Sequence, residues 1–285
     1  MLAHAGAVLA PRVARNGVAT LAFTSGSTGR PKTAALTHAA FLAASSSKAA
    51  AVGYCSSDVY LHAAPLCHVG GLSSAHAILA AHGRHIFPPS GAFRPLEAAS
   101  LIRRHAITAL ICVPTTLFDL VGVASALHGG GPFTTVRRLL LGGGAVLPSA
   151  AAAAAAAFPS ARIVSTYAMT EACSTLSFRM LFDPNSHKNV SGGGGESFDD
   201  AALVGDAAPG VALRLDAATS EIQACSEQLM RGYWPLSASP DPAVFTPDGW
   251  LRTGDLGRRS SEDPTDARIR FVGRASASIR TGKET

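Results

Sequence analysis

Apolar residues recur along the first two thirds of the chain in short runs that alternate with longer amphipathic stretches. The short runs predict strands, because they end at glycine, proline or polar residues. These runs cover residues 33–36, 58–64, 84–87, 107–113, 136–141 and 162–166. The predicted helices cover residues 38–51, 73–81, 94–105, 115–127 and the alanine run at 151–157. The regular alternation predicts an α/β fold with a parallel sheet covered by helices.

The pattern changes after residue 182. Residues 183–202 are rich in Ser and Gly and predict a disordered surface insertion. Beyond them the helical periodicity is lost, and strands are predicted at 211–215, 221–224 and 269–272. We therefore expect an α/β part over 1–182, the insertion, and a small β-rich subdomain over 203–272.

The stretch from Phe23 to Lys32 combines glycines, hydroxyls and a lysine. Glycine lets the backbone approach a bulky anion, successive N–H groups can form an anion-binding nest, and Lys32 adds a mobile charge. These features predict a polyphosphate-binding loop, with a flexible Ser/Gly linker as the alternative. A Walker P-loop is excluded, because Pro31 stands where that motif needs glycine. The residues expected at phosphate are Thr24, Ser25, Gly26, Ser27, Thr28, Gly29 and Lys32.

Two further loops leave predicted strands. One is Gly142-Gly143-Gly144, and the other runs from Tyr167 to Glu171. In open α/β sheets ligands bind beyond the carboxyl ends of the strands, so both loops are expected at a ligand site. The alternatives are a simple glycine turn and, for Glu171, a carboxylate stabilised at a helix N-terminus.

Composition narrows the function classes. The chain has 285 residues, 47% hydrophobic and 15% charged, with a net charge of +5 that suits an anionic ligand. The positive charges are dispersed, which argues against nucleic acid as a partner. No apolar run approaches the ~20 residues of a membrane span. The five cysteines lie far apart without C-x-x-C spacing, which indicates reduced thiols and no zinc site.

Several stretches resemble, in the same order, the signature segments of the adenylate-forming superfamily of acyl-CoA synthetases, luciferases and peptide-synthetase adenylation domains. They begin at Phe23, Pro65, Gly142, Tyr167, Gly249 and Val272. Residues 53–68 and 170–174 are similar to the plant-type 2-succinylbenzoate–CoA ligases of phylloquinone and menaquinone synthesis. The resemblance implies an ATP- and Mg²⁺-dependent acid–CoA ligase. A carboxylic acid would form an acyl-adenylate, and the thiol of CoA would then displace AMP.

The resemblance also implies roles for single residues. Residues 24–32 would hold the β- and γ-phosphates, Thr170 would donate to the α-phosphate, and Glu171 would bind Mg²⁺, so Lys32, Thr170 and Glu171 would be catalytic. Asp255 and Arg274 would approach the ribose, although Asp255 could instead be a turn residue. The implied adenine neighbours are Gly142, Gly143, Gly144, Ala145 and Tyr167. The implied acyl-pocket residues are His68, Gly70 and Gly71, with a structural role for His68 as the alternative.

Family members carry a further N-terminal portion and a small C-terminal domain with a catalytic lysine. Against that pattern the chain is truncated at both ends, with residues 273–285 as a hinge remnant. We therefore expect weak nucleotide binding and slow turnover. The alternatives are an impaired nucleotide-binding fragment, a fatty-acyl or aryl-acid CoA ligase, and an adenylation domain. The resemblance allows a plastid or peroxisomal location, although no targeting signal is visible.

Overall fold

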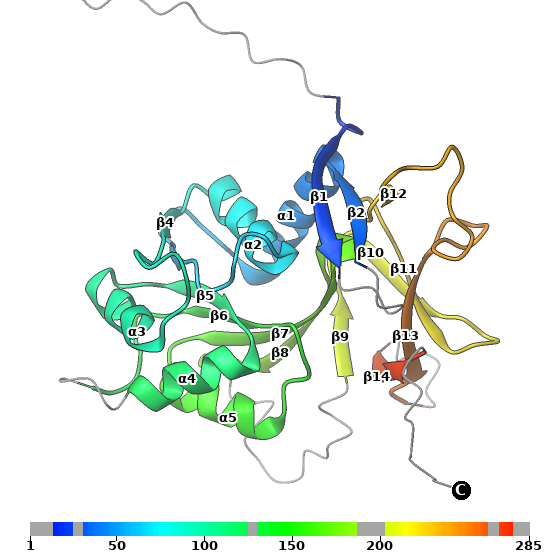
Figure 1. Ribbon diagram of the computed structural model, residues 1–285. Helices are drawn as coiled ribbons and strands as arrows, with labels where there is room; N and C mark the ends of the chain where they lie inside the picture. The colour runs from blue at the N-terminus through cyan, green and yellow to red at the C-terminus, as the bar shows by residue number, and fades with distance from the viewer. Residues whose placement is uncertain (1–13, 25–30, 125–129, 187–202, 262–267, 276–285) are drawn as a thin grey trace, which may run out of the picture.

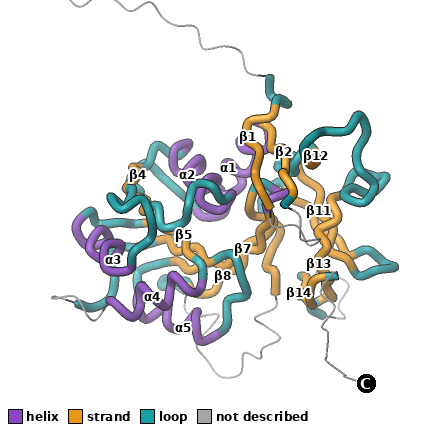
Figure 2. Tube along the Cα trace, viewed as in Figure 1, coloured by secondary structure: helices purple, strands orange, loops and turns teal. Residues whose placement is uncertain are grey.

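The computed structural model describes residues 14–24, 31–124, 130–186, 203–261 and 268–275 (Figures 1 and 2). Its helices are α1 (His38–Val52), α2 (Val69–Ala80), α3 (Pro95–Arg104), α4 (Pro114–Ala124), α5 (Pro148–Ala157) and the 3₁₀ turn η1 (Thr170–Ala172). The strands of the α/β part are β3 (Val59–Leu61), β4 (Arg84–Ile86), β5 (Ala109–Cys112), β6 (Arg138–Leu141), β7 (Arg162–Met169) and β8 (Ser174–Phe182). The others are β1 (Val18–Thr24), β2 (Lys32–Thr37), β9 (Leu203–Ala207), β10 (Val211–Leu215), β11 (Glu221–Ser226), β12 (Gly232–Tyr233), β13 (Leu251–Arg259) and β14 (Ile269–Arg274).

One large sheet runs through most of the described chain, in the order β10-β11-β13-β14-β9-β8-β7-β6-β5-β3-β4. Neighbours in the part of this order formed by β7, β6, β5, β3 and β4 pair in parallel. Neighbours in the part formed by β10, β11, β13, β14, β9, β8 and β7 pair antiparallel. The α/β fold with a β-rich part is thus confirmed, with a mixed sheet in place of a purely parallel one. The β-rich part continues the same sheet, because β9 pairs with β8.

Helices cover both faces of the parallel strands (Figure 1). In β6, Leu139 and Leu141 pack with α3, α4 and α5, whereas Leu140 packs on the opposite face with α2. Successive side chains of a strand point to opposite faces, so a strand covered on both sides must be apolar throughout. The short apolar runs in the sequence are therefore the inner strands of this sheet.

The predicted strand at 58–64 is present as β3, and its Tyr60 is fully buried because helices cover both sides of this strand. A helix was predicted to begin at residue 73, but α2 already begins at Val69. In addition, strands β8 and β13 were not predicted.

A second sheet, in the order β1-β2-β12, joins the N-terminal hairpin to a distant segment. Strands β1 and β2 pair antiparallel, and β12 adds to β2 with Tyr233 opposite Ala34. The backbone N–H of Met230 also donates to the carbonyl of Glu171 at 2.7 Å. These contacts bring Tyr233 beside the end of β2 that carries Lys32.

Some predictions fall outside the described residues: the polyphosphate loop at 25–30, most of the Ser/Gly-rich insertion and most of the hinge remnant. They stay predictions. Within the described ranges, the longest apolar helices are too short to cross a membrane.

Candidate active site

Two adjoining cavities lie where the parallel strands end and the β-rich part begins. The smaller one, of ≈ 280 Å³, is lined by the loop after β6, the end of β7, β9, Asp255 of β13 and Arg274 of β14. The larger one measures ≈ 830 Å³. Its polar lining includes Thr24, Lys32, His68, Thr170, Glu171, Tyr233, Arg252 and Arg274. Ala168 and Arg274 line both cavities, so residues far apart in the sequence converge on one continuous site.

Asp255 is the buried acid of the smaller cavity, at 2% exposure. Its Oδ2 accepts a hydrogen bond from the Tyr167 hydroxyl at 2.7 Å, and its Oδ1 lies 2.8 Å from Nε of Arg274. That second contact is an ion pair without hydrogen-bond geometry, so Oδ1 has no hydrogen-bond partner among the described residues. Burial raises the pKa of Asp255, while Tyr167 and Arg274 oppose the shift. A buried acceptor with spare capacity suits a ligand hydroxyl.

The three glycines that follow β6 differ in why each position is occupied by glycine. A Cβ on Gly142 would lie 2.6 Å from Oγ1 of Thr166, and Gly143 has φ +78. These two positions therefore need glycine for the turn itself. Gly144 has nothing within 4 Å of such a Cβ and lines the smaller cavity. At Gly144, therefore, neither packing against neighbouring atoms nor a positive φ accounts for the glycine.

A short chain of contacts crosses the larger cavity. The Tyr233 hydroxyl donates to Oε1 of Glu171 at 2.7 Å, and Nζ of Lys32 lies 4.9 Å from the centroid of the Tyr233 ring. Burial raises the pKa of Tyr233, so its hydroxyl keeps its proton at neutral pH. Tyr233 therefore bridges the expected phosphate lysine and the expected metal ligand. The position of Tyr233 in the site could not be predicted from the neighbouring sequence, because the pairing of β12 with the distant β2 places it there.

The donor set fits Mg²⁺ rather than a metal held by protein alone. Mg²⁺ uses one or two carboxylates and completes its shell with water and phosphate oxygens. Glu171 supplies a carboxylate in a cavity that Thr170 also lines. Across the described ranges, no three His, Cys, Asp or Glu side chains gather as a metal site.

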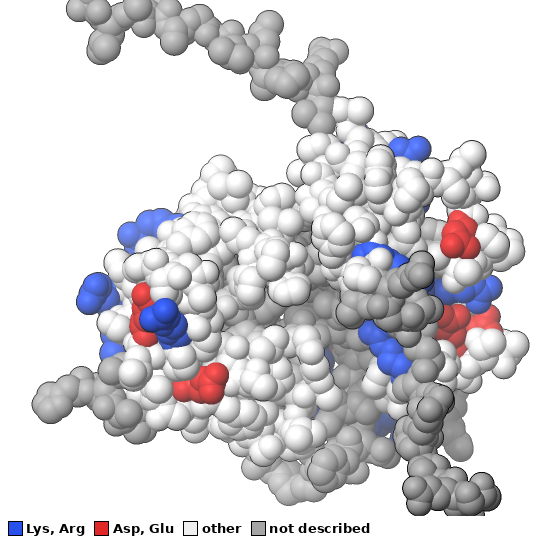
Figure 3. All heavy atoms as spheres, viewed as in Figure 1, with Lys and Arg blue, Asp and Glu red and all other residues white. Residues whose placement is uncertain are grey.

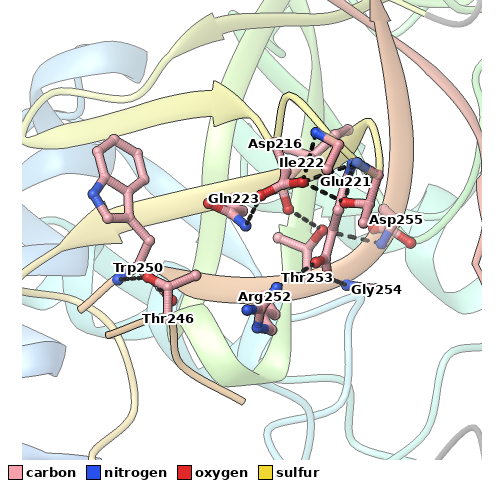
Figure 4. A network of polar contacts seen from close by, with 12 residues as sticks. Asp216, Glu221, Ile222, Gln223, Thr246, Trp250, Arg252, Thr253, Gly254 and Asp255 are labelled. Carbon is pink, nitrogen blue, oxygen red and sulfur yellow. Dashed lines mark hydrogen bonds and ion pairs between the residues drawn. The ribbon is translucent and has the colours of Figure 1, made fainter. Parts of the chain in front are cut away.

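A polar network fixes the backbone between the two cavities (Figure 4). Oε1 of Glu221 accepts from the N–H of Gly254 at 2.9 Å, and its Oε2 pairs with Arg252 at 3.4 Å. The Thr253 hydroxyl donates to a β11 carbonyl at 2.6 Å and accepts from the N–H of Asp255 at 3.1 Å. Gly254 adopts φ +71, which favours glycine. Asp255 thus lies inside a strand, where side chains hold its position.

Of the residues predicted to line the acyl pocket, only His68 lines one of the two cavities. His68 precedes α2 and lines the larger cavity. Gly70 and Gly71 lie in the first turn of α2 and line neither of the two cavities. A Cβ on Gly71 would lie 2.3 Å from the carbonyl oxygen of Pro65, so packing of the fold accounts for this glycine.

Charged side chains on one face of the molecule stand in separate groups (Figure 3). One group lies over the helical part and another over the β-rich part, with uncharged surface between them. Lys32, Arg252 and Arg274 supply positive charge to the larger cavity, and Glu171 and Glu221 supply negative charge. This mixture suits a polyphosphate accompanied by a cation.

A family model described as AMP-binding enzyme matches residues 4–234. The chain belongs to this family. The resemblance to adenylate-forming enzymes is therefore confirmed. Among curated members, the chain is 34% identical to the chloroplastic/peroxisomal 2-succinylbenzoate–CoA ligase of Arabidopsis thaliana, over 93% of this chain and 48% of the relative. It is 30% identical to the sulfoacetate–CoA ligase of Cupriavidus necator, over 93% of this chain and 49% of the relative.

Solved structures of AMP-binding enzymes share the fold. O-succinylbenzoate CoA synthetase from Bacillus subtilis, in complex with ATP and magnesium, matches with a TM-score of 0.73 and 24% identity, over 95% of this chain and 53% of that one. ATP-bound MatB from Rhodopseudomonas palustris matches with a TM-score of 0.72 and 26% identity, over 92% and 49%. The chain spans about half the length of the curated relatives it matches.

Proposed function

We propose that this chain forms the nucleotide-binding part of an ATP-dependent acid–CoA ligase, with 2-succinylbenzoate as the acid. The observation that carries the proposal is the pair of adjoining cavities. One contains the buried acceptor Asp255, and the other contains Lys32 and Glu171. Family membership and the 34% identity to a 2-succinylbenzoate–CoA ligase support the reaction class and the acid.

Adenosine occupies the smaller cavity in this proposal. Oδ1 of Asp255 accepts from a ribose hydroxyl, which satisfies its unused hydrogen-bonding capacity. The adenine ring lies over Gly144 and beside Tyr167, both of which line this cavity. The phosphates then pass Arg274 into the larger cavity, because Arg274 lines both.

The triphosphate lies in the larger cavity, where Lys32 and Arg274 neutralise charge. Thr170 donates to the α-phosphate, and Glu171 holds Mg²⁺ with its carboxylate oriented by Tyr233. Bound Mg²⁺ supplies positive charge to the phosphate oxygens. A carboxylate oxygen of the acid forms a bond to the α-phosphorus while the bond to pyrophosphate breaks. The CoA thiolate then attacks the acyl carbon, the thiol proton passes to solvent, and AMP leaves.

The test is pyrophosphate exchange into ATP with a panel of acids: 2-succinylbenzoate, 4-coumarate, sulfoacetate and a fatty acid. We expect exchange above the acid-free background with 2-succinylbenzoate, and loss of that exchange in Asp255→Ala. Preference for another acid would overturn the choice of substrate but not the reaction class. Calorimetric binding of Mg·ATP without exchange for any acid would instead indicate a nucleotide-binding fragment.

We also propose a plastid or peroxisomal location, because the name of the Arabidopsis thaliana relative gives these compartments. A fluorescent fusion to the product of the complete gene tests this. Uniform cytosolic fluorescence would contradict it.

A further inference from the structure

Lys48 of α1 is a cation buried away from both cavities, with 1% of its surface exposed. Its Nζ donates to three hydroxyls: Ser73 at 2.6 Å, Ser74 at 3.2 Å and Ser174 at 3.3 Å. Within the described part of the chain, no carboxylate forms an ion pair with it. Burying an ammonium group is costly unless it is well hydrogen-bonded, so this lysine needs an explanation.

The three serines lie on two elements that adjoin lining residues of the larger cavity. Ser73 and Ser74 belong to α2, which directly follows His68. Ser174 begins β8 and comes three residues after Glu171, just beyond η1. One buried ammonium therefore ties the His68 helix to the turn that carries Thr170 and Glu171.

The turn at Cys173 and Ser174 is strained. Cys173 has φ 51 and Ser174 has φ 116, a region that residues with a Cβ rarely adopt. Strain of this kind persists only where surrounding contacts hold the backbone. Here Cys173 is fully buried, and its N–H donates to the carbonyl of Thr170 at 3.1 Å. The hydroxyl of Ser174 accepts a hydrogen bond from Nζ of Lys48.

We propose that Lys48 is a positioning residue for the metal–phosphate half of the site. It holds the strained turn at Ser174 and so directs Thr170 and Glu171 into the larger cavity. This inference rests on the proposed nucleotide site but assigns a residue outside it.

Among the residues that the structure describes, no ion pair accounts for the burial of Lys48. Burial lowers the pKa of Lys48 to about 7, and among the described residues no carboxylate pairs with its Nζ. Burial raises the pKa of Tyr60, which faces Ser74. The described partners of Nζ are therefore the serine hydroxyls, to which both the charged and the neutral amine can donate. These hydrogen bonds connect α1 to α2 and to the first residue of β8.

The test compares Lys48→Met with the control Asp58→Asn, which also neutralises a buried charged residue. Asp58 pairs with Arg138 at 2.6 Å, and none of its described side-chain hydrogen bonds reaches η1 or α2. Calorimetry measures affinity for Mg·ATP and for adenosine. We expect Lys48→Met to weaken Mg·ATP binding by up to about 10-fold, as for loss of side-chain hydrogen bonds, and adenosine binding less than twofold. Asp58→Asn should leave the ratio of the two affinities unchanged.

Hydrogen exchange of the amides at 170–176 provides the second measurement, and it needs no ligand. We expect faster exchange there in Lys48→Met but not in Asp58→Asn. Equal weakening of Mg·ATP and adenosine, or unchanged exchange at 170–176, would overturn the inference. Absence of Mg·ATP binding by the unmodified protein would refute the proposed function instead, and the exchange result would still decide the role of Lys48.

Discussion

Replacing Lys48 by methionine should change how stability depends on pH. Burial lowers the pKa of Lys48 from 10.5 to about 7. Between these two pH values the unfolded chain keeps a proton that the folded protein has lost, so unfolding takes up a proton and stability rises with pH. Each pH unit in this window is worth about 1.4 kcal/mol. About half of the folded molecules are still protonated at pH 7, so Lys48 should add on the order of 2 kcal/mol to the free energy of unfolding between pH 7 and pH 9.

Urea unfolding at pH 6, 7, 8 and 9 measures this for the unmodified protein and for Lys48→Met. The difference between the two free energies isolates Lys48, because contributions from other titrating groups cancel. The neighbouring thiol of Cys173, with its pKa raised to about 12, stays neutral throughout. We expect the difference to be flat below pH 7 and then to move in favour of the lysine protein. A difference that stays constant from pH 6 to 9, or moves the other way, would refute a buried, readily deprotonated Lys48.

Three further substitutions test other parts of the site. Tyr233→Phe removes the 2.7 Å donor to Glu171, so the Mg²⁺ concentration needed for half-maximal ATP binding should rise about fivefold, with unchanged adenosine affinity as the control. Gly144→Ala should lower adenosine affinity without lowering the melting temperature, because the added Cβ has no protein atom within 4 Å; unchanged affinity would place adenine elsewhere. Gly71→Ala should cost about 1–3 kcal/mol in urea unfolding, because its Cβ would lie 2.3 Å from a carbonyl oxygen. The matched Gly70→Ala should be neutral or stabilising, and equal costs would contradict that packing.

The parts of the fold that sequence could predict are those with a local pattern. The run Leu139–Leu141 is apolar because both sides of β6 are covered, and it indicates an inner strand without any knowledge of its partners. The strand at 58–64 was likewise predicted from a local pattern, whereas the burial of Tyr60 depends on the helices that pack over it. Asp255 was assigned from its motif, but its place inside β13 depends on contacts with β11 that no local pattern reveals.

Long-range contacts account for what could not be predicted at the site. Tyr233 reaches Glu171 only because β12 pairs with β2. Lys48 reads as one more residue of an alanine- and serine-rich helix, and its partner Ser174 is 126 residues away. Such pairs need the folded structure. The polyphosphate loop at 25–30 was predicted from local chemistry, and it remains a prediction.

The central claim is that one ATP spans both cavities, held by Asp255 at the sugar and Glu171 at the metal. The most direct measurement is calorimetric titration of Mg·ATP into the unmodified protein, Asp255→Ala and Glu171→Ala. The account predicts a single Mg·ATP site in the unmodified protein and at least about 10-fold weaker binding in each variant. Asp255→Ala loses a hydrogen bond to a charged group, and Glu171→Ala loses a metal ligand. Unchanged Mg·ATP affinity in either variant would show that the two carboxylates do not share a ligand.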